Sequence, residues 1–179
     1  MYRDTGDQAL IASVLTHLGF TFLLQGDLER ATAATEEAAA MLREQKHLSY
    51  VAYALINLGW IARHRGDSEW ARALNIESVR LLLDTGDKLS VPEELEGLAC
   101  VAEARGETER AARLFGASEA LHEAMGTIPE PGERALQEPY LAAARSKLDE
   151  AVWQEAWAQG RVMTLEEVIS YALEEEASE

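Results

Sequence analysis

The stretch DTGD at positions 4–7 returns at positions 84–87. Two copies of Asp-Thr-Gly are the pattern with which two-lobed aspartic proteases supply paired carboxylates that share one proton. That chemistry needs a β-rich lobe around each aspartate, whereas both stretches here lie among segments of helical pattern. We therefore expect the repeated stretch to have a structural role.

The other groups that could do chemistry are four histidines and one cysteine: His17, His47, His64, His122 and Cys100. No two histidines lie three or four residues apart, so no helix presents a paired metal site. Glu119 and His122 have the spacing of di-iron ligands, but such a site needs a second motif and further carboxylates. Cys100 has no base near it in the sequence and is expected to be a buried thiol. We expect a protein that is not an enzyme, with no catalytic residue, no metal and no cofactor.

Composition narrows the class of protein further. The chain has 179 residues, enough for one domain with a core, and its low aromatic content of 7% beside abundant Ala, Leu and Glu favours helix. A formal net charge of −16 argues against direct nucleic-acid binding, because phosphate contacts need clustered Lys and Arg. No apolar run approaches the roughly 20 residues that span a membrane, and the N-terminus lacks a signal-peptide pattern. We expect a cytoplasmic protein without a membrane partner.

One pattern occurs three times at an interval of 40 residues. It reads LTHLGFTFLLQGDLERA at 15–31, LINLGWIARHRGDSEWA at 55–71 and LEGLACVAEARGETERA at 95–111. A fixed period between about 20 and 50 residues indicates a stacked repeat array. The aligned positions are Leu15, Leu55 and Leu95; Leu18, Leu58 and Leu98; Gly19, Gly59 and Ala99; Gly26, Gly66 and Gly106; Ala31, Ala71 and Ala111.

Each copy predicts two helices joined by a short turn. Gly26 and its equivalents end the first helix, and the acid that follows is a good N-cap for the second. The small residues at fixed places let the two backbones approach closely, so Gly19, Gly59 and Ala99 should face the interior. We expect the second helices to end near Gln45, Asp84 and Met125.

The repeat also gives an interpretation of DTGD. In the 40-residue register Gly6, Lys46, Gly86 and Gly126 are equivalent, and glycine commonly takes the left-handed cap after a helix. DTGD is therefore predicted to be a helix stop at both places. Gly6 has almost no chain before it, so we expect either that the array continues upstream of Met1 or that the first helix docks elsewhere.

The segment after the third copy has a different pattern. Pro129 and Pro131 break the array. Helices are then expected at about 134–148 and 149–159, and Thr164 with Glu167 forms a capping box that begins a last helix at Leu165. Solenoid ends need a cover, and we assign that role to these helices.

The pattern Leu-x-x-Leu-Gly, then Gly-Asp, then Ala resembles the tetratricopeptide repeat (TPR). The usual repeat has about 34 residues and a Pro at the end of its second helix, whereas Arg43, Leu83 and Glu123 stand at that place here. The lengthened version resembles the sensor arm of bacterial signal-transduction ATPase regulators, the STAND and LuxR-type transcription regulators that include maltose-activator-like factors. The tail around Trp157, Gly160 and 165–167 is similar to the C-terminal ends of such regulators.

The resemblance implies an all-α fold, a right-handed superhelical array of 40-residue helix–turn–helix repeats with C-terminal capping helices. The three repeats fall in 1–127, with units near 10–46, 50–86 and 90–126, and the Pro-containing loop and capping helices fall in 128–179. The chain contains no phosphate-binding loop and no helix-turn-helix pattern. We therefore expect a non-enzymatic interaction or effector-sensing arm of a transcription regulator. The alternative is a free-standing TPR adaptor that holds proteins together.

The resemblance also implies that the first helices of the repeats line a concave surface. By register the candidate binding residues are Phe20, Tyr53, Ile56, Trp60, Arg63, Glu96 and Glu103. Two interpretations stay open. These residues form a groove, apolar in its N-terminal half and acidic in its C-terminal half, for a protein or peptide segment or a small effector; or they are packing residues. A homo-oligomer is a further possibility.

Charge is concentrated at the C-terminal end. Residues 149–179 contain nine acids and one base, Arg161, which gives 1 − 9 = −8, half of the total net charge. One interpretation is a solvated helix face with a frayed end. The other is a patch for a basic partner.

Overall fold

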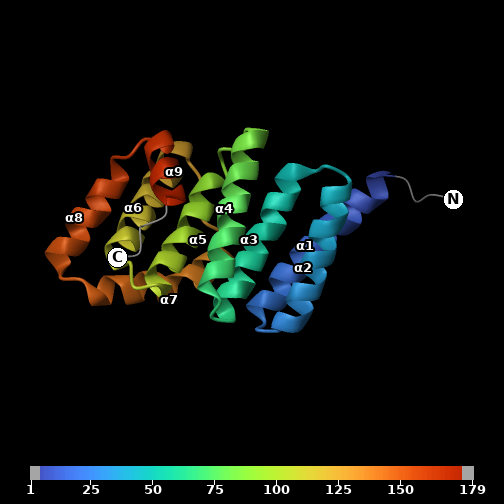
Figure 1. Ribbon diagram of the computed structural model, residues 1–179, viewed down its shortest axis with the longest axis horizontal. Helices are drawn as coiled ribbons and strands as arrows, with labels where there is room; N and C mark the ends of the chain where they lie inside the picture. The colour runs from blue at the N-terminus through green and yellow to red at the C-terminus, as the bar shows by residue number, and fades with distance from the viewer. Residues whose placement is uncertain (1–4, 175–179) are drawn as a thin grey trace. The chain divides into compact units, whose positions relative to one another are not determined.

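The computed structural model describes residues 5–174, and this part of the chain contains nine helices and no strand (Figure 1). The predicted all-α class is confirmed. The chain divides into two compact units, 1–88 with α1–α4 and 89–179 with α5–α9. The helices are α1 (Thr5–Leu24), α2 (Leu28–Glu44), α3 (Leu48–His64), α4 (Ser68–Thr85), α5 (Val91–Ala104), α6 (Thr108–Met125), α7 (Pro131–Lys147), α8 (Glu150–Arg161) and α9 (Leu165–Leu173).

A left-handed residue follows each of the first six helices. These residues have φ between 58° and 82° and recur every 20 positions: Gly26, Lys46, Gly66, Gly86, Gly106 and Gly126. At each one the next residue donates its N–H to a carbonyl five residues back, as Asp27 does to Phe22 at 2.9 Å, which closes a Schellman motif. A helix with its turn therefore occupies 20 residues, half of the sequence period. The second helices end at Glu44, Thr85 and Met125, within a residue of the predicted ends.

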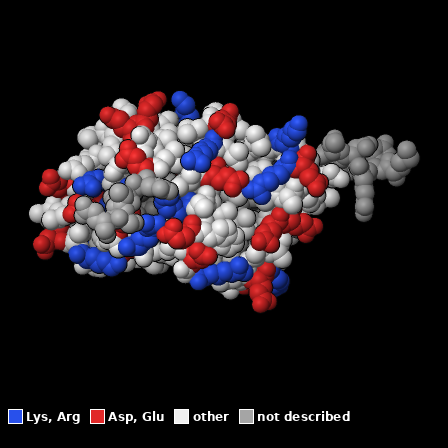
Figure 2. Space-filling model, in the orientation of Figure 1, with Lys and Arg blue, Asp and Glu red and all other residues white. Residues whose placement is uncertain are grey.

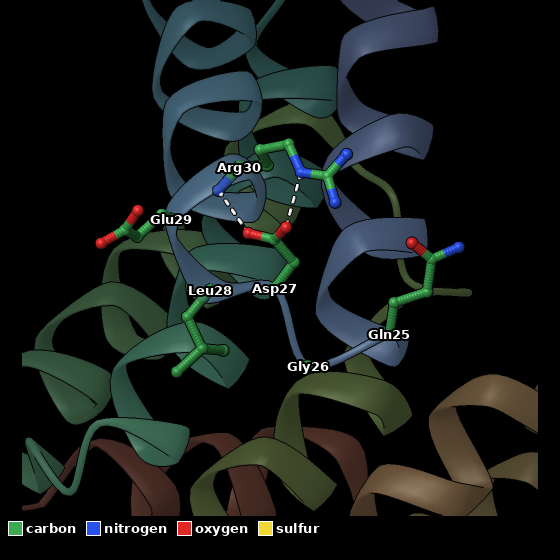
Figure 3. A pocket seen from close by; sticks show the side chains of 6 residues that line it. All are labelled: Gln25, Gly26, Asp27, Leu28, Glu29 and Arg30. Atoms are coloured by element: carbon green, nitrogen blue, oxygen red, sulfur yellow. Dashed lines mark hydrogen bonds and ion pairs between the residues drawn. The ribbon is translucent and has the colours of Figure 1, made fainter.

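The acid after the turn caps the next helix, as expected, in two of the three repeats. The Oδ1 atom of Asp27 accepts from the N–H of Arg30 at 3.1 Å, and that of Asp67 accepts from the N–H of Trp70 at 2.9 Å. Figure 3 shows that the second carboxylate oxygen of Asp27 also accepts from Nε of Arg30. Glu107 is in the same position without a side-chain cap. Its longer side chain instead accepts from Nε of Arg105 at 2.6 Å.

Small residues bring the two helices of each pair into close contact. Ala31, Ala71 and Ala111 have no exposed surface. A Cβ atom added to Gly19 would overlap Oγ1 of Thr35 across the α1–α2 contact. Gly19, Gly59 and Ala99 are all buried, so the expected interior face of the first helices is confirmed.

The two DTGD stretches have different structures. Gly86 ends α4 in the left-handed conformation, with φ 76°, as predicted. At positions 4–7 the prediction is wrong, because α1 begins at Thr5 and Gly6 lies in its first turn. A left-handed cap satisfies the carbonyls at the end of a helix, and among the described residues no helix precedes Gly6.

In the second unit α7 packs against both α5 and α6, and α8 lies along α6. α7 begins at Pro131, earlier than expected, because Glu130 and Glu133 form a capping box and proline fits the first helical position. The predicted capping box at Thr164 is confirmed. α8 approaches α6 through glycines: a Cβ atom on Gly160 would overlap the carbonyl oxygen of Arg113.

Within the second unit an arginine joins α9 to α6. Arg110 of α6 is 7% exposed and its Nη2 donates to the carbonyls of Tyr171 at 2.6 Å and Glu174 at 3.0 Å. These are carbonyls at the C-terminal end of α9, where a cation is favoured by the helix dipole. The guanidinium also stacks 4.7 Å from the ring centroid of Tyr171.

Lys46 is the only non-glycine residue with positive φ among the described residues, at 58°. The left-handed conformation costs a residue with a Cβ atom about 1–2 kcal/mol. We expect Lys46→Gly to stabilise the protein by about 1 kcal/mol after the greater chain entropy of glycine in the unfolded state is subtracted. Urea denaturation measures the change, with Gly86→Lys as the matched control that should lose a similar amount. Equal midpoints for wild type and Lys46→Gly would contradict the argument.

Candidate functional site

The structure places five of the seven predicted binding residues in the interior. Phe20 is half-buried and Tyr53 is 36% exposed. The exposed fractions of the others are 6% for Ile56, 3% for Trp60, 6% for Arg63, 7% for Glu96 and 3% for Glu103. For these five the structure shows a packing role, and a binding role stays a prediction. Phe20, Tyr53, Ile56, Trp60 and Arg63 belong to the first unit, and Glu96 and Glu103 to the second.

In the first unit Trp60 and Arg63 form a stacked pair on α3. The guanidinium carbon of Arg63 lies 3.8 Å from the ring centroid of Trp60, as a spacing of one helical turn allows. Nη1 of Arg63 also donates to Oδ1 of Asn75 on α4 at 2.8 Å. Stacking on an indole and donation to an amide are both ways in which a buried guanidinium is satisfied. No sequence motif pointed to Asn75; the only signal was a polar residue within the apolar stripe of α4.

An exposed aromatic group lies at the start of α3. The ring centroids of His47 and Tyr50 are 6.3 Å apart, and those of Tyr50 and Tyr53 are 6.4 Å apart. We name these three residues the tyrosine cluster. Tyr50 is 53% exposed, and the hydroxyl of Tyr53 donates to Oδ2 of Asp87 at 3.3 Å. Only Tyr53 was predicted; the spacing of three residues between the tyrosines was the signal for Tyr50.

In the second unit Glu96 belongs to a buried polar group. Its Oε1 accepts from Oγ of Ser118 at 3.0 Å and lies 3.6 Å from Nε2 of His122. The other ring nitrogen of His122 is 2.8 Å from Oγ1 of Thr127. Burial raises the pKa of the nearby Glu133 carboxyl, and repulsion from Glu96 adds to this, while a hydrogen bond from a backbone N–H lowers it. The cluster connects α5, α6 and the start of α7.

Glu103, the other predicted acid, is held by the C-terminal segment. Nζ of Lys147, the last residue of α7, forms an ion pair with Oε1 of Glu103 on α5. The buried residues of α7 are Leu136, Gln137 and Ala144. The register assigned this position of α5 to the binding surface. The observed partner of Glu103 is a residue of α7 in the same chain. No pattern in the sequence indicated Lys147 as a partner of Glu103.

Two surface hollows lie among the described residues, and each is small or open. One of about 590 Å³ lies at the α1–α2 turn and is lined by residues 25–30 (Figure 3). The carboxylate of Asp27 already occupies the positive end of α2 there, and the N–H of Arg30 lowers its pKa. A second hollow, of about 200 Å³, lies between α7 and α8 beside Trp153 and Trp157. Its volume is below the range of about 300–1,000 Å³ that is usual for ligand sites.

Some of the acids near the C-terminus have intramolecular roles. Glu150 pairs with Arg145 at 3.1 Å, and Glu167 caps α9. Arg161 forms ion pairs with Glu119 and Glu123 of α6, the latter at 2.5 Å. Figure 2 shows acidic and basic side chains interspersed on the visible face. Part of the expected acidic patch, Glu175, Glu176 and Glu179, lies outside the described residues, and its role as a site for a basic partner stays a prediction.

Within residues 5–174 no three His, Cys, Asp or Glu side chains are grouped to hold a metal ion. Cys100 is fully buried, as expected. In the same part of the chain no helix combines the length and the apolar character that crossing a membrane requires. No protein-family model matches the chain, and no curated protein or solved structure is significantly similar to it.

Trp60 offers a test of the packing role. Truncation of a buried tryptophan leaves a cavity, so we expect Trp60→Ala to lower the free energy of unfolding by about 3–5 kcal/mol. The exposed Tyr53 is the control on the same helix, and Tyr53→Ala should lose no more than about 1 kcal/mol. Guanidinium denaturation of both variants measures this. Similar losses for the two variants would show that Trp60 is not part of the core.

The half-buried acid Glu133 predicts a pH dependence. Because the pKa of Glu133 in the folded state is raised above its ordinary value, the folded state binds more protons in the interval between the two values, and stability falls as pH rises through the folded pKa. The variant Glu133→Gln retains an acceptor for the backbone N–H without the charge. We expect its melting temperature to exceed that of wild type at neutral pH and to converge with it as pH falls to about 4. A constant difference across this range would contradict the assignment.

Proposed function

We propose that the chain is a non-enzymatic helical-repeat domain that binds a protein segment or a small effector, and that it is the sensing arm of a bacterial transcription regulator. In this proposal the helix pairs form a right-handed superhelical array of TPR-like repeats, and α7–α9 are its capping helices. The support is the recurrence of a left-handed turn every 20 residues together with the buried small residues of each pair. A period of this kind is typical of solenoid proteins.

The observation that favours binding most directly is the contact of α7 with α5. Glu103 lies on the first helix of its repeat, at a position that the register assigns to the concave side. Its partner is Lys147, and α7 buries Leu136 and Ala144. A surface that holds a helix of its own chain by an ion pair and apolar contacts has the chemistry needed for a helical segment of a partner.

In the first unit the tyrosine cluster is the surface that a partner can reach. Tyrosine offers a large apolar area and a hydroxyl at low cost in side-chain entropy, and it is enriched among the residues that dominate binding energy. Tyr50 is 53% exposed and Tyr53 is 36% exposed, whereas Ile56 and Trp60 on the same helix are buried. We propose that a partner reaches the first unit at the tyrosine cluster.

A photo-crosslinking side chain at position 53 tests partner binding at the tyrosine cluster inside the cells that produce the protein. We expect one discrete adduct, a single protein segment or an effector of defined mass, and an about ten-fold lower yield after Tyr50→Glu, because loss of a hot-spot contact costs about 1.4 kcal/mol or more. The matched control is the same side chain at Ala40, which is exposed on α2. Equal labelling at positions 40 and 53 would overturn the proposed binding surface.

The reading frame upstream of Met1 separates the two classes of function. A nucleotide-binding module encoded in the same frame is the expected result for a regulator arm. A stop codon followed by a ribosome-binding site would favour the free-standing adaptor and overturn the assignment to a regulator.

A further inference from the structure

A histidine and a carboxylate lie close together in the interior of the second unit without a hydrogen bond between them. Glu96 of α5 is 7% exposed, and His122 of α6 is 6% exposed. Nε2 of His122 lies 3.6 Å from Oε1 of Glu96 and has no hydrogen-bond partner among the described residues. A buried polar atom without a partner is costly. A proton on this nitrogen would place a positive charge beside the carboxylate and offset that cost.

The surroundings of His122 allow the ring to change its charge. Its other nitrogen, Nδ1, lies 2.8 Å from Oγ1 of Thr127. Because a hydroxyl can both donate and accept, this hydrogen bond persists whether the ring is neutral or protonated. His122 also lies in the last turn of α6, where the helix dipole favours a cation. The contact that changes with the charge of the ring is therefore the one between Nε2 and Glu96.

Glu133 connects this pair to the first turn of α7. Its Oε2 accepts from the N–H of Glu130 at 3.1 Å, as part of the capping box that begins the helix. Burial raises the pKa of Glu133, and repulsion from Glu96 and Glu130 raises it further, whereas the N–H of Glu130 and the charge of His122 lower it. The carboxylates of α5 and α7 therefore repel each other, and the charge of His122 on α6 offsets that repulsion.

We propose that Glu96, His122 and Glu133 form a proton-operated latch that holds the start of α7 on α5 and α6. With protons bound, the imidazolium pairs with Glu96 and the Glu133 carboxyl is uncharged, so repulsion does not oppose the contact. As pH rises, the ring loses its charge and Glu133 gains one, which leaves two carboxylates that repel each other. The latch is closed at acidic pH and loosens across the range of about pH 5–8 in which histidine side chains change charge. This inference does not depend on the proposed function.

The N-terminal half of α7 is the segment that the latch can release. The buried residues of α7 are Leu136, Gln137 and Ala144. Pro139 lies inside the helix and has no N–H to continue the hydrogen bonding between its two halves. A segment with few buried apolar contacts opens locally at low free energy. The far end of α7 is held separately by the ion pair of Lys147 with Glu103.

Hydrogen exchange of the folded protein, followed by mass spectrometry from about pH 5 to 8, tests the latch once each rate is divided by the intrinsic rate at that pH. A group that binds its proton about ten-fold more tightly in the closed form changes the opening equilibrium by up to about ten-fold. We expect the protection of residues 132–138 to fall about ten-fold as pH rises, while that of α8 stays constant. Constant protection of residues 132–138 would overturn the proposal.

Variants assign the effect to the cluster. Glu133→Gln retains the acceptor for the capping box, and at pH 8 it should keep the protection that wild type has at pH 5. His122→Gln removes the cation, and at pH 5 its protection should fall toward the wild-type value at pH 8. Glu138→Gln is the matched control, since Glu138 is exposed on α7, and its pH dependence should equal that of wild type. An unchanged pH dependence in Glu133→Gln and His122→Gln would overturn the latch.

Nuclear magnetic resonance of the His122 ring in wild type tests the same step without relying on the stability of a variant. We expect the ring carbon shifts to report a change of charge over the pH interval in which residues 132–138 lose protection. A ring that keeps one charge state from about pH 5 to 8 would overturn the role of His122.

Discussion

The left-handed residue that ends each of the first six helices is the constraint on which the rest of the structure depends. It terminates the helix at a fixed interval along the sequence and closes the Schellman hydrogen bond. Because these residues recur every 20 positions, equivalent residues of successive pairs fall on equivalent sides. The small residues Ala31 and Ala71 then meet the helix before them, and the pairs can repeat. Lys46 adopts the same conformation with φ 58°, so the register persists where glycine is missing.

Periodicity made the helix pairs, their ends and their inner faces predictable from the sequence. It failed at Gly6, because the register says where a glycine recurs but not whether a helix precedes it. The candidate site was less predictable. The register placed Trp60 and Arg63 on one side of a helix, and the observed stack agrees with that. Their exposed fractions of 3% and 6% depend on the segments that pack over them. Contacts between distant segments, such as Lys147 with Glu103, leave no local pattern in the sequence.

Ionisable groups lie in the interior of both units: Arg63 in the first, and Glu94, Glu96, Glu103, Arg110 and His122 in the second. Arg63 is stacked and donates to Asn75, and Glu96 accepts from Ser118 and lies near His122. Buried polar groups of this kind add little net stability compared with apolar packing, but a wrong arrangement costs several kcal/mol. In repeats whose apolar positions are nearly interchangeable, such groups distinguish one register from another. They account for the polar character of the inner helices without any ligand.

The availability of polar groups distinguishes the buried inner helices from two exposed surfaces, the tyrosine cluster and the apolar side of α1. Where the inner helices are buried, their polar residues already have partners within the chain, and a ligand would have to compete with them. The tyrosine cluster has its rings at the surface, with Tyr50 53% exposed, and a partner can reach it without displacing the core. The exposed apolar residues Leu10, Ile11, Val14 and Leu18 on the outer side of α1 have neither charge nor aromatic hydroxyl and offer only apolar area. Apolar area without polar anchors suits a permanent contact with a helix pair, whereas tyrosine hydroxyls and rings suit a reversible one. The chemistry of the tyrosine cluster therefore supports the start of α3 as the place where the proposed partner binds.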